Sequence, residues 1–228
     1  MKTAIVIDFD NTIGYFKQIV YLLNIIEKTH KKKYDQTDID NLLKLYPNVL
    51  RPKINDIFLL VDEMRYKDKI DYFGLYTTNK NKKFVNMIID FIERNIYSGK
   101  NTLFDFKIFS SKKDNPVETL SQERLIKNNR PITICFIDNK KLNTNHTYEN
   151  IISILIKCDS YKYIYDIREI GKSFDYCYYK HITKKIITKY LTHIYNGVNL
   201  TNLPYQLIEM NSNHLLQVVS EFCYLHRC

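Results

Sequence analysis

The stretch that decides the fold is TAIVIDFDNT, residues 3–12. Its first part is a continuous apolar run ending at Ile7, and such a short run is typical of a buried β-strand. Asp8 and Asp10 follow directly, with Thr12 just beyond them. Because a buried charge is costly unless a cation compensates it, two carboxylates at the end of this strand indicate chemistry rather than folding.

The rest of the chain alternates between strand and helix patterns. Apolar, β-rich segments predict strands at 3–9, 71–78, 104–111, 132–138 and 161–167. Helical spacing of apolar residues predicts helices at 15–30, 37–46, 54–67, 79–97, 117–128 and 148–158, and again within 181–195 and 213–226. Strands that are apolar on both faces and alternate with helices predict an α/β fold with a doubly wound, Rossmann-type parallel sheet.

The same pattern predicts how the chain is divided. We expect a core at residues 1–170 that is interrupted by a small helical cap insertion at about 14–50. Residues 171–228 look helical and rich in tyrosine, and we expect them to form a C-terminal extension packed on the core.

Composition narrows the class of protein. The 228 residues are 45% hydrophobic, and no apolar run is long enough to span a bilayer, so we expect no membrane segment. The five cysteines include no C-x-x-C pair, which fits reduced thiols and an intracellular location, cytoplasmic or nuclear. The abundance of lysine, isoleucine, asparagine and tyrosine fits an AT-rich genome such as that of a large DNA virus, and hence a host cytoplasm. The net charge of +9 favours an anionic partner, although the same bias would also produce it.

In a parallel sheet, ligands bind beyond the carboxyl ends of the strands. The polar residues expected there are Asp8 and Asp10, Thr77 and Thr78, Ser110 to Lys113, and Asp138 with Asn139. Clustered carboxylates repel, and oxygen ligands suit Mg²⁺. Hydroxyls and a lysine beside them would complement a phosphate. One carboxylate can attack phosphorus, and a second can protonate the leaving group and then activate water.

This set of residues resembles the haloacid dehalogenase superfamily of phosphotransferases. IVIDFDNTI resembles its first motif, which implies that Asp8 is the nucleophile and Asp10 the acid/base, with the main-chain carbonyl of Asp10 on Mg²⁺. LYTTNK resembles the second motif and implies that Thr77 or Thr78 holds the phosphoryl group. CFIDNKKLN resembles the last motif, in which Asp138 would bind Mg²⁺ with support from Asn139.

A narrower resemblance is to the branch that dephosphorylates the carboxy-terminal domain of RNA polymerase II. LYTTN, Leu50-Arg51-Pro52 and Asp138-Asn139 each fit it, and the alignment favours Thr77 over Thr78. Two features depart from that branch. Lys140 and Lys141 replace its Ser-Pro, and the segment between Thr12 and Leu50 looks helical.

The superfamily's third motif implies a lysine that holds the nucleophile and the phosphate together. Lys113 is our first choice, because Lys113-Asp114 resembles the motif's K-D and precedes a helix. Lys112 and Lys127 remain as alternatives.

The expected function is Mg²⁺-dependent hydrolysis of a phosphate monoester through an aspartyl-phosphate on Asp8. A phosphoprotein is one expected substrate and a small metabolite or nucleotide the other. An alternative from a different class is a catalytically silent module that binds nucleic acid or protein through the basic, tyrosine-rich C-terminal part.

Overall fold

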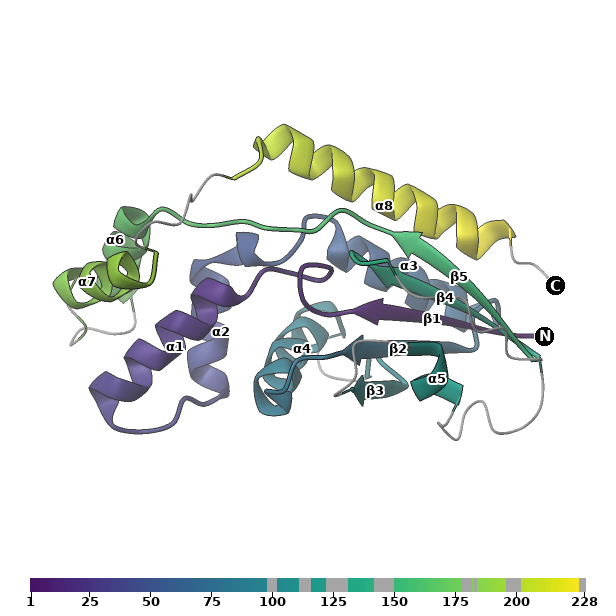
Figure 1. Cartoon of the computed structure of the whole chain (residues 1–228), viewed down its shortest axis with the longest axis horizontal. Coiled ribbons are helices and arrows are strands. Elements are labelled where there is room, and N and C mark those ends of the chain that lie inside the picture. The colour runs from purple at the N-terminus through teal and green to yellow at the C-terminus, as the bar shows by residue number, and fades with distance from the viewer. Residues whose placement is uncertain are drawn as a thin grey trace. The chain divides into compact units, whose positions relative to one another are not determined.

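A five-stranded parallel sheet forms the centre of the computed structural model (Figure 1). The structure describes residues 1–97, 102–110, 116–121, 131–141, 150–177, 182, 184–195 and 202–225. The strands are β1 (Lys2–Asp8), β2 (Tyr72–Thr77), β3 (Phe106–Phe109), β4 (Ile132–Asp138) and β5 (Ile151–Lys157). The helices are α1 (Lys17–His30), α2 (Gln36–Leu45), the 3₁₀ helix η1 (Pro47–Val49), α3 (Ile54–Tyr66), α4 (Lys82–Tyr97), α5 (Pro116–Ser121), α6 (Ile167–Cys177), α7 (Lys184–Tyr195) and α8 (Tyr205–Leu225).

The strands lie in the order β3-β2-β1-β4-β5. The chain therefore builds one half of the sheet outward from β1 and then returns to build the other half beginning beside β1. This is the doubly wound arrangement, in which the strand order reverses between β1 and β4. The predicted α/β fold with a parallel sheet is confirmed. The order also makes β1 the central strand, so its carboxyl end lies at the point of reversal.

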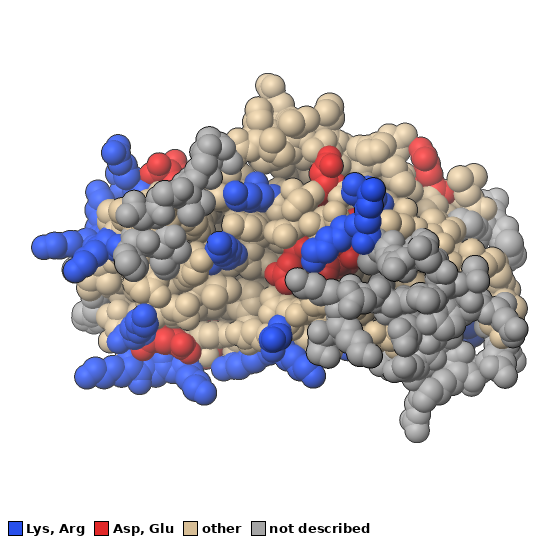
Figure 2. All heavy atoms as spheres, in the orientation of Figure 1, with Lys and Arg blue, Asp and Glu red and all other residues tan. Residues whose placement is uncertain are grey.

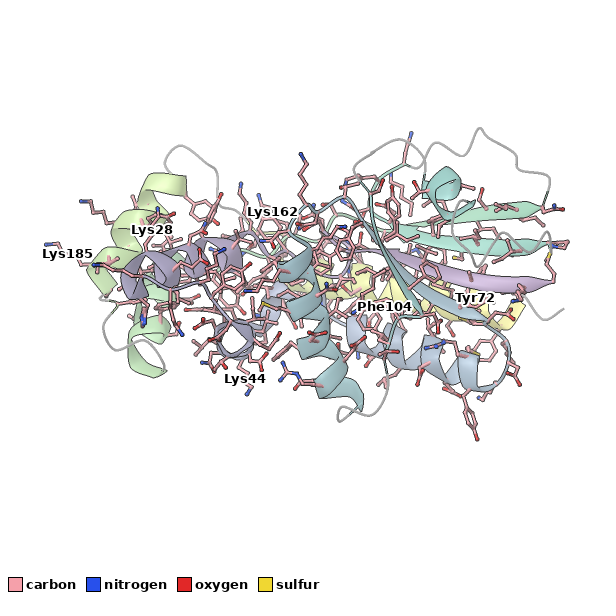
Figure 3. All side chains as sticks on the ribbon, turned by 90° about the horizontal axis from the view of Figure 1, so that it is seen from below. Lys28, Lys44, Tyr72, Phe104, Lys162 and Lys185 are labelled. Carbon is pink, nitrogen blue, oxygen red and sulfur yellow. The ribbon has the colours of Figure 1, made fainter. Side chains whose placement is uncertain are left out.

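Alternating residues of the strands face two apolar layers. Ala4 and Val6 belong to a buried cluster with Phe136 of β4 and with Val117 and Leu120 of α5. On the other face, Phe73 of β2 contacts Phe58 of α3 at a ring-centroid distance of 5.9 Å. Phe73 also contacts Phe104, which is labelled in Figure 3, at 4.7 Å. Burial on both faces explains why the central strands are continuous apolar runs in the sequence.

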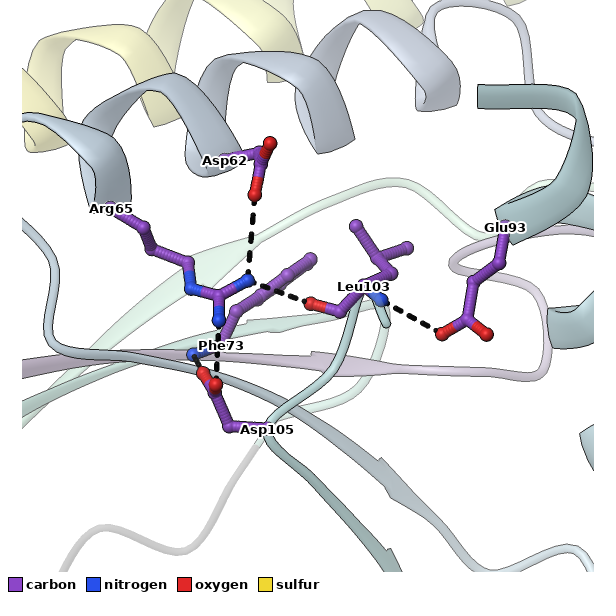
Figure 4. Close-up of polar contacts among 6 residues, drawn as sticks. All are labelled: Asp62, Arg65, Phe73, Glu93, Leu103 and Asp105. Carbon is purple, nitrogen blue, oxygen red and sulfur yellow. Dashed lines mark hydrogen bonds and ion pairs between the residues drawn. The ribbon is translucent and has the colours of Figure 1, made fainter. Parts of the chain in front are cut away.

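The segment that leads into β3 is fixed by a polar network (Figure 4). Arg65 of α3 donates to the carbonyl of Leu103 at 3.1 Å and to the carboxylate of Asp105 at 2.6 Å. The other oxygen of Asp105 accepts from the backbone N–H of Phe73 at 2.7 Å, and the N–H of Leu103 donates to Glu93 at 2.9 Å. Every acid in this network has a partner, so the network serves the packing of β3 against β2 and α3.

Two predicted elements are wrong. Residues 148–158 were expected to form a helix, but 151–157 form strand β5, paired with β4 from Ile132↔Ile151 to Asp138↔Lys157. The run IISILIK contains four isoleucines, and β-branched side chains favour a strand where an open sheet edge is available. Residues 161–167 were expected to form the fifth strand, but 161–166 have no regular structure and α6 begins at Ile167.

The chain forms two compact units. Unit 1 comprises 1–14, 51–161 and 206–228 and contains the sheet. Unit 2 comprises 15–50 and 162–205 and is helical. This grouping includes the segment expected as a cap, but it differs from the predicted division at the C-terminal side. Residues 162–205 belong with 15–50, and only the last segment, which contains most of α8, belongs with the sheet.

Within unit 2, side-chain contacts join the two segments. The side chain of Gln18 pairs with the backbone of Tyr165, donating to its carbonyl at 3.0 Å and accepting from its N–H at 2.8 Å. The hydroxyl of Tyr165 accepts from the N–H of Asn48 at 2.8 Å. These contacts explain why segments that are far apart in the sequence form one unit. No helix among the described residues is long and apolar enough to cross a membrane.

Candidate active site

The carboxyl ends of β1, β2 and β4 bring three predicted site residues to one edge of the sheet, which we call the carboxyl edge. Asp8 pairs in register with Tyr76, the residue before Thr77, and Ile7 pairs with Ile137, the residue before Asp138. Asp8 and Asp138 each expose only 7% of their surface, and Thr77 exposes none. The strand order therefore places a hydroxyl and two nearly buried carboxylates on neighbouring strands, as the sequence predicts.

The turn after β1 orients Asp8. The hydroxyl of Thr12 lies 3.2 Å from the Asp8 carboxylate and donates to it. The chain can turn back this sharply because Asn11 adopts a left-handed conformation, with φ of 63°, and its N–H donates to the carbonyl of Gly14 at 2.8 Å. Asparagine tolerates this conformation better than most residues. The spacing D-x-D-x-T thus returns the threonine to the first aspartate.

Asp10 is held from the neighbouring strand end by Asn79. The side-chain amide of Asn79 lies 3.1 and 3.4 Å from the two carboxylate oxygens of Asp10. The N–H of Asn79 in turn donates to the hydroxyl of Thr77 at 3.0 Å. This bond uses the Thr77 hydroxyl as an acceptor, so its hydrogen can still be donated to a ligand. Thr78 follows the end of β2 and is partly exposed, and the structure therefore gives Thr77 the more enclosed position.

Sequence reasoning did not assign a role to Asn79. Asn79 belongs to the stretch LYTTNK, but its contact with Asp10 spans 69 positions and depends on β1 and β2 being neighbours. A local signal was present. The side chain of Asn79 also accepts from the N–H of Asn81, and the side chain of Asn81 accepts from that of Phe84 in the first turn of α4, each at 3.0 Å. An Asn-x-Asn pair between a strand and a helix indicates such a turn.

The end of β4 supplies a third carboxylate. One oxygen of Asp138 accepts from the N–H of Lys140 at 2.8 Å. The side-chain oxygen of Asn139 is buried and has no hydrogen-bond partner among the described residues. A buried polar atom without a partner is costly, and it marks a place where a water molecule or a ligand would be favoured.

The electrostatics of the carboxyl edge are unfavourable for Asp8 as an anion. Burial above all, and then the negative charges of Asp138 and Asp10, raise the pKa of Asp8 to about 7, against the opposite effects of Lys140 and the Thr12 hydroxyl. Burial also raises the pKa of Asp10, against the effects of Asn79 and Lys140. The protein thus gathers carboxylates whose charges oppose one another, as in sites that bind a cation.

The same forces act on Asp138. Burial raises its pKa, while the N–H and the charge of Lys140 lower it. Lys140 is therefore the cation whose charge reaches all three acids. From the sequence, Lys140 was noted only as a residue that replaces part of a Ser-Pro pattern, and no role was predicted for its charge. Lys113, Lys112 and Lys127, the candidates for the phosphate-binding lysine, lie outside the described residues.

The carboxyl edge offers carboxylate and carbonyl oxygens, which are the ligands that Mg²⁺ prefers. Among the residues that the structure describes, no group of three or more His, Cys, Asp or Glu side chains could hold a metal ion by itself. The predicted ligand set differs from such a group, since it uses Asp8, the main-chain carbonyl of Asp10 and Asp138. The effect of the Asp138 charge on the pKa of Asp8 and the unpartnered oxygen of Asn139 fit a hard cation with oxygen ligands.

Comparisons with protein-family models, with curated proteins and with solved structures gave no match for this chain. The geometry and electrostatics of the carboxyl edge are therefore the observations that bear on function.

Proposed function

We propose that the protein is a Mg²⁺-dependent phosphatase that hydrolyses a phosphate monoester through an aspartyl-phosphate on Asp8. One observation carries the proposal. Asp8 and Asp138 end neighbouring parallel strands and are almost completely buried, and the negative charge of Asp138 raises the pKa of Asp8. A pair of this kind needs a compensating cation, and the hydroxyl of Thr77 on the next strand supplies a donor for an anion.

Each residue then has a role that its surroundings support. Thr77 donates its hydroxyl hydrogen to the phosphoryl group, and a lysine neutralises part of the phosphate charge. Among the described residues, Lys140 is the lysine whose charge acts on Asp8 at this edge. Lys113 is the phosphate-binding lysine that the sequence predicts. The carboxylate of Asp8, oriented by Thr12, attacks phosphorus. Asp8, the Asp10 carbonyl and Asp138 would hold a bound cation, which would supply positive charge that favours the ionised form of Asp8 and the negative charge of the phosphoryl oxygens.

Asp10 completes the two half-reactions. As the bond between phosphorus and the leaving oxygen breaks, protonated Asp10 gives its proton to that oxygen. The resulting carboxylate then takes a proton from water, whose oxygen attacks phosphorus and releases phosphate and the Asp8 carboxylate. Burial supports the acid role because it raises the pKa of Asp10 and so favours the protonated form. Asn79, which donates to both Asp10 oxygens, stabilises the anion that the second half-reaction requires.

Two substrate classes remain proposals. The resemblance of LYTTN, Leu50-Arg51-Pro52 and Asp138-Asn139 to one branch of the superfamily favours a phosphoprotein. A small metabolite or nucleotide is the second class.

The test is hydrolysis of a generic aryl phosphate by the full chain, with Mg²⁺ or with excess EDTA. Wild-type protein should turn over only with Mg²⁺. Asp8→Asn, which keeps the size of the side chain, should reduce turnover by about 10⁴-fold or more, because the nucleophile is lost. The matched control is Asp105→Asn, a substitution of the same kind in the network of Figure 4, which should retain turnover. Absence of Mg²⁺-dependent turnover in folded wild-type protein would refute the proposal.

A second candidate function, binding of nucleic acid, is favoured by the charge of unit 2. This unit contains 13 Lys and Arg against 7 Asp and Glu, whereas unit 1 contains 21 against 18. Compositional bias alone would spread the excess over both units. Figure 2 shows basic side chains at several places on the face of this unit that it draws, and Figure 3 labels Lys28 of α1 and Lys185 of α7.

The arrangement of these lysines suits a phosphate backbone. Of the described Lys and Arg residues of unit 2, only Lys32 forms an ion pair with a described residue. The ammonium of Lys28 lies 4.9 Å from the ring centre of Tyr190, so α1 and α7 present charge beside an aromatic side chain. We expect binding of a single-stranded oligonucleotide that weakens steeply with salt. The double variant Lys184→Gln/Lys185→Gln should weaken it, and Lys82→Gln/Lys83→Gln on α4 of unit 1 should not. Equal effects of the two pairs would refute a specific surface.

A further inference from the structure

Arg51 is buried in unit 1 and has an unusual set of partners. It exposes only 3% of its surface. The ion pairs among the described residues do not include it, although the charge of Asp159 acts in its favour. Burial lowers the pKa of its guanidinium group, which means that the protein bears a cost for keeping the charge there. A buried charge is a poor means of stabilising a fold, so the contacts of Arg51 call for another reason.

The partners of Arg51 are main-chain carbonyls from two separate segments. Its Nε donates to the carbonyl of Thr12 at 2.7 Å, and its Nη2 donates to that of Asn11 at 3.1 Å. Nη2 also donates to the carbonyl of Asp159, which follows β5. In addition, the backbone N–H of Arg51 donates to the carbonyl of Ile13 at 2.9 Å. One planar side chain therefore joins the turn after β1 to the segment after β5.

Both joined segments lead directly to the carboxyl edge. From Thr12, the hydroxyl reaches Asp8 at 3.2 Å. From the segment after β5, the N–H of Cys158 donates to the carbonyl of Asp138 at 3.0 Å. The sulfur of Cys158 lies close to both Arg51 and Thr12, at 3.8 Å from Nη2 of Arg51 and 4.0 Å from the Thr12 hydroxyl oxygen. One residue, Thr12, therefore separates the guanidinium group from the Asp8 carboxylate, and one residue, Cys158, separates it from the main chain of Asp138.

The turn that Arg51 holds is conformationally costly. Asn11 has a φ of 63°, a left-handed conformation that is unfavourable for most residues other than glycine. Its carbonyl receives two hydrogen bonds, one from Arg51 and one from the N–H of Tyr161 at 2.8 Å. The ring of Tyr161 lies near the guanidinium group, with 5.4 Å from Cζ of Arg51 to the ring centre. The turn is therefore over-determined by its surroundings, which is what a fixed position of Asp8 requires.

We infer that Arg51 is a positioning residue, which fixes the turn 11–13 against the segment 158–161 and thereby sets the Asp8 carboxylate relative to Asp138. The inference rests on the proposed function for its catalytic consequence. Its structural part, the coupling of the turn to the segment after β5, does not.

The experiment compares Arg51→Lys with wild type in the full chain by two measurements. Hydrogen exchange followed by NMR reports the amides of Cys158 and Tyr161. We expect at least about tenfold faster exchange of the Tyr161 amide, because lysine has a single nitrogen and cannot keep both the Nε bond to Thr12 and the Nη2 bonds to Asn11 and Asp159. Steady-state hydrolysis of an aryl phosphate with Mg²⁺ should show kcat reduced by about 10- to 100-fold, with KM within about threefold, because Asp8 is misplaced while Thr77 is untouched.

The matched control is Arg65→Lys, since Arg65 also donates to a main-chain carbonyl of unit 1 but at the start of β3. It should lower the melting temperature while leaving kcat and the Tyr161 amide unchanged. If Arg51→Lys does not fold, Arg51→Gln removes the buried charge, keeps one donor group, and should show the same two effects.

The route through Thr12 makes the inference sharper. In a Thr12→Val background, Arg51→Lys should reduce kcat by less than about threefold further, because the link to Asp8 is already lost. Unchanged kcat and unchanged amide exchange in folded Arg51→Lys would overturn the inference, as would a full additional loss in the Thr12→Val background. If wild type shows no turnover but Arg51→Lys still speeds exchange of the Tyr161 amide, the proposed function fails and the positioning role stands.

Discussion

Two groups of acidic side chains lie at opposite ends of the strands of one sheet. The charge of one group is compensated by neighbouring donors, and the charge of the other is not. At the start of β3, Asp105 accepts from Arg65 at 2.6 Å and from the N–H of Phe73 at 2.7 Å, so its charge is compensated (Figure 4). At the carboxyl edge, Asp8 is nearly buried, accepts one hydrogen bond from Thr12, and faces two further carboxylates. The same residue type serves packing at one edge, and at the other it retains an electrostatic cost that only a ligand would remove.

The largest expected effect separates the two groups by activity. Asp10→Asn should reduce kcat by about 10²- to 10⁴-fold, because it removes the general acid and base. The loss should be greater with an alkyl phosphate than with an aryl phosphate, since a poor leaving group needs the proton more. Asp105→Asn should leave kcat within about twofold for both substrates. Steady-state kinetics on the two substrates decide the point, and an equal loss on both would argue against Asp10 as the acid.

The next effect concerns stability and pH in the absence of metal. The pKa of Asp8 is raised to about 7 in the folded protein, from an unfolded value near 3.8. The folded state therefore binds the proton more tightly, and this contribution is complete below about pH 4 and is lost as the pH rises through about 7. Wild type should lose about 2 to 4 kcal/mol relative to Asp8→Asn between pH 4 and pH 8.

Urea denaturation at both pH values, with EDTA present, measures the difference. The control is Asp105→Asn, which should not gain stability at pH 8. If the difference in free energy of unfolding between Asp8→Asn and wild type is the same at pH 4 and at pH 8, Asp8 does not carry the burial cost that we assign to it.

The acids at the start of β3, whose charge Arg65 compensates, should matter for stability and not for activity. Arg65→Met removes contacts to Asp105, to the Leu103 carbonyl and to Asp62, and only the Asp105 oxygen that faces Phe73 keeps its donor from this network. We expect a loss of about 1 to 3 kcal/mol in the free energy of unfolding, at the lower end because Arg65 is partly exposed. The value of kcat per folded molecule should be unchanged. A drop in kcat of more than about threefold would break the distinction between the two edges.

The sequence was sufficient for the parts of the fold that depend on local pattern. Apolar runs ending in polar residues located β1, β2 and β4, and with them Asp8, Thr77 and Asp138. It failed where tertiary context decides. IISILIK fits a helix by spacing and a strand by its β-branched residues, and the open edge of β4 selects the strand.

The supporting residues of the site were harder to predict for a related reason. Asn79 meets Asp10, and Arg51 meets Thr12, only because the sheet order brings their segments together, and neither contact leaves a local signature of its partner. Lys140 shows a different limit. Its departure from a family pattern was visible in the sequence, but the effect of its charge on three carboxylates required their positions.

The smallest expected effect tests that charge. Lys140 is exposed, so its attraction for a phosphate is screened by solvent and should be worth only about 1 kcal/mol. Lys140→Gln should therefore lower kcat/KM for an aryl phosphate about 3- to 10-fold at low salt, and less at high salt as the wild-type advantage is screened. Lys141→Gln is the matched control, because it removes the same charge one residue farther from Asp138, and it should change kcat/KM less than twofold. Equal losses in the two variants would mean that the general basic field attracts the substrate, and would leave the lysine that faces Asp8 to be sought among Lys112, Lys113 and Lys127.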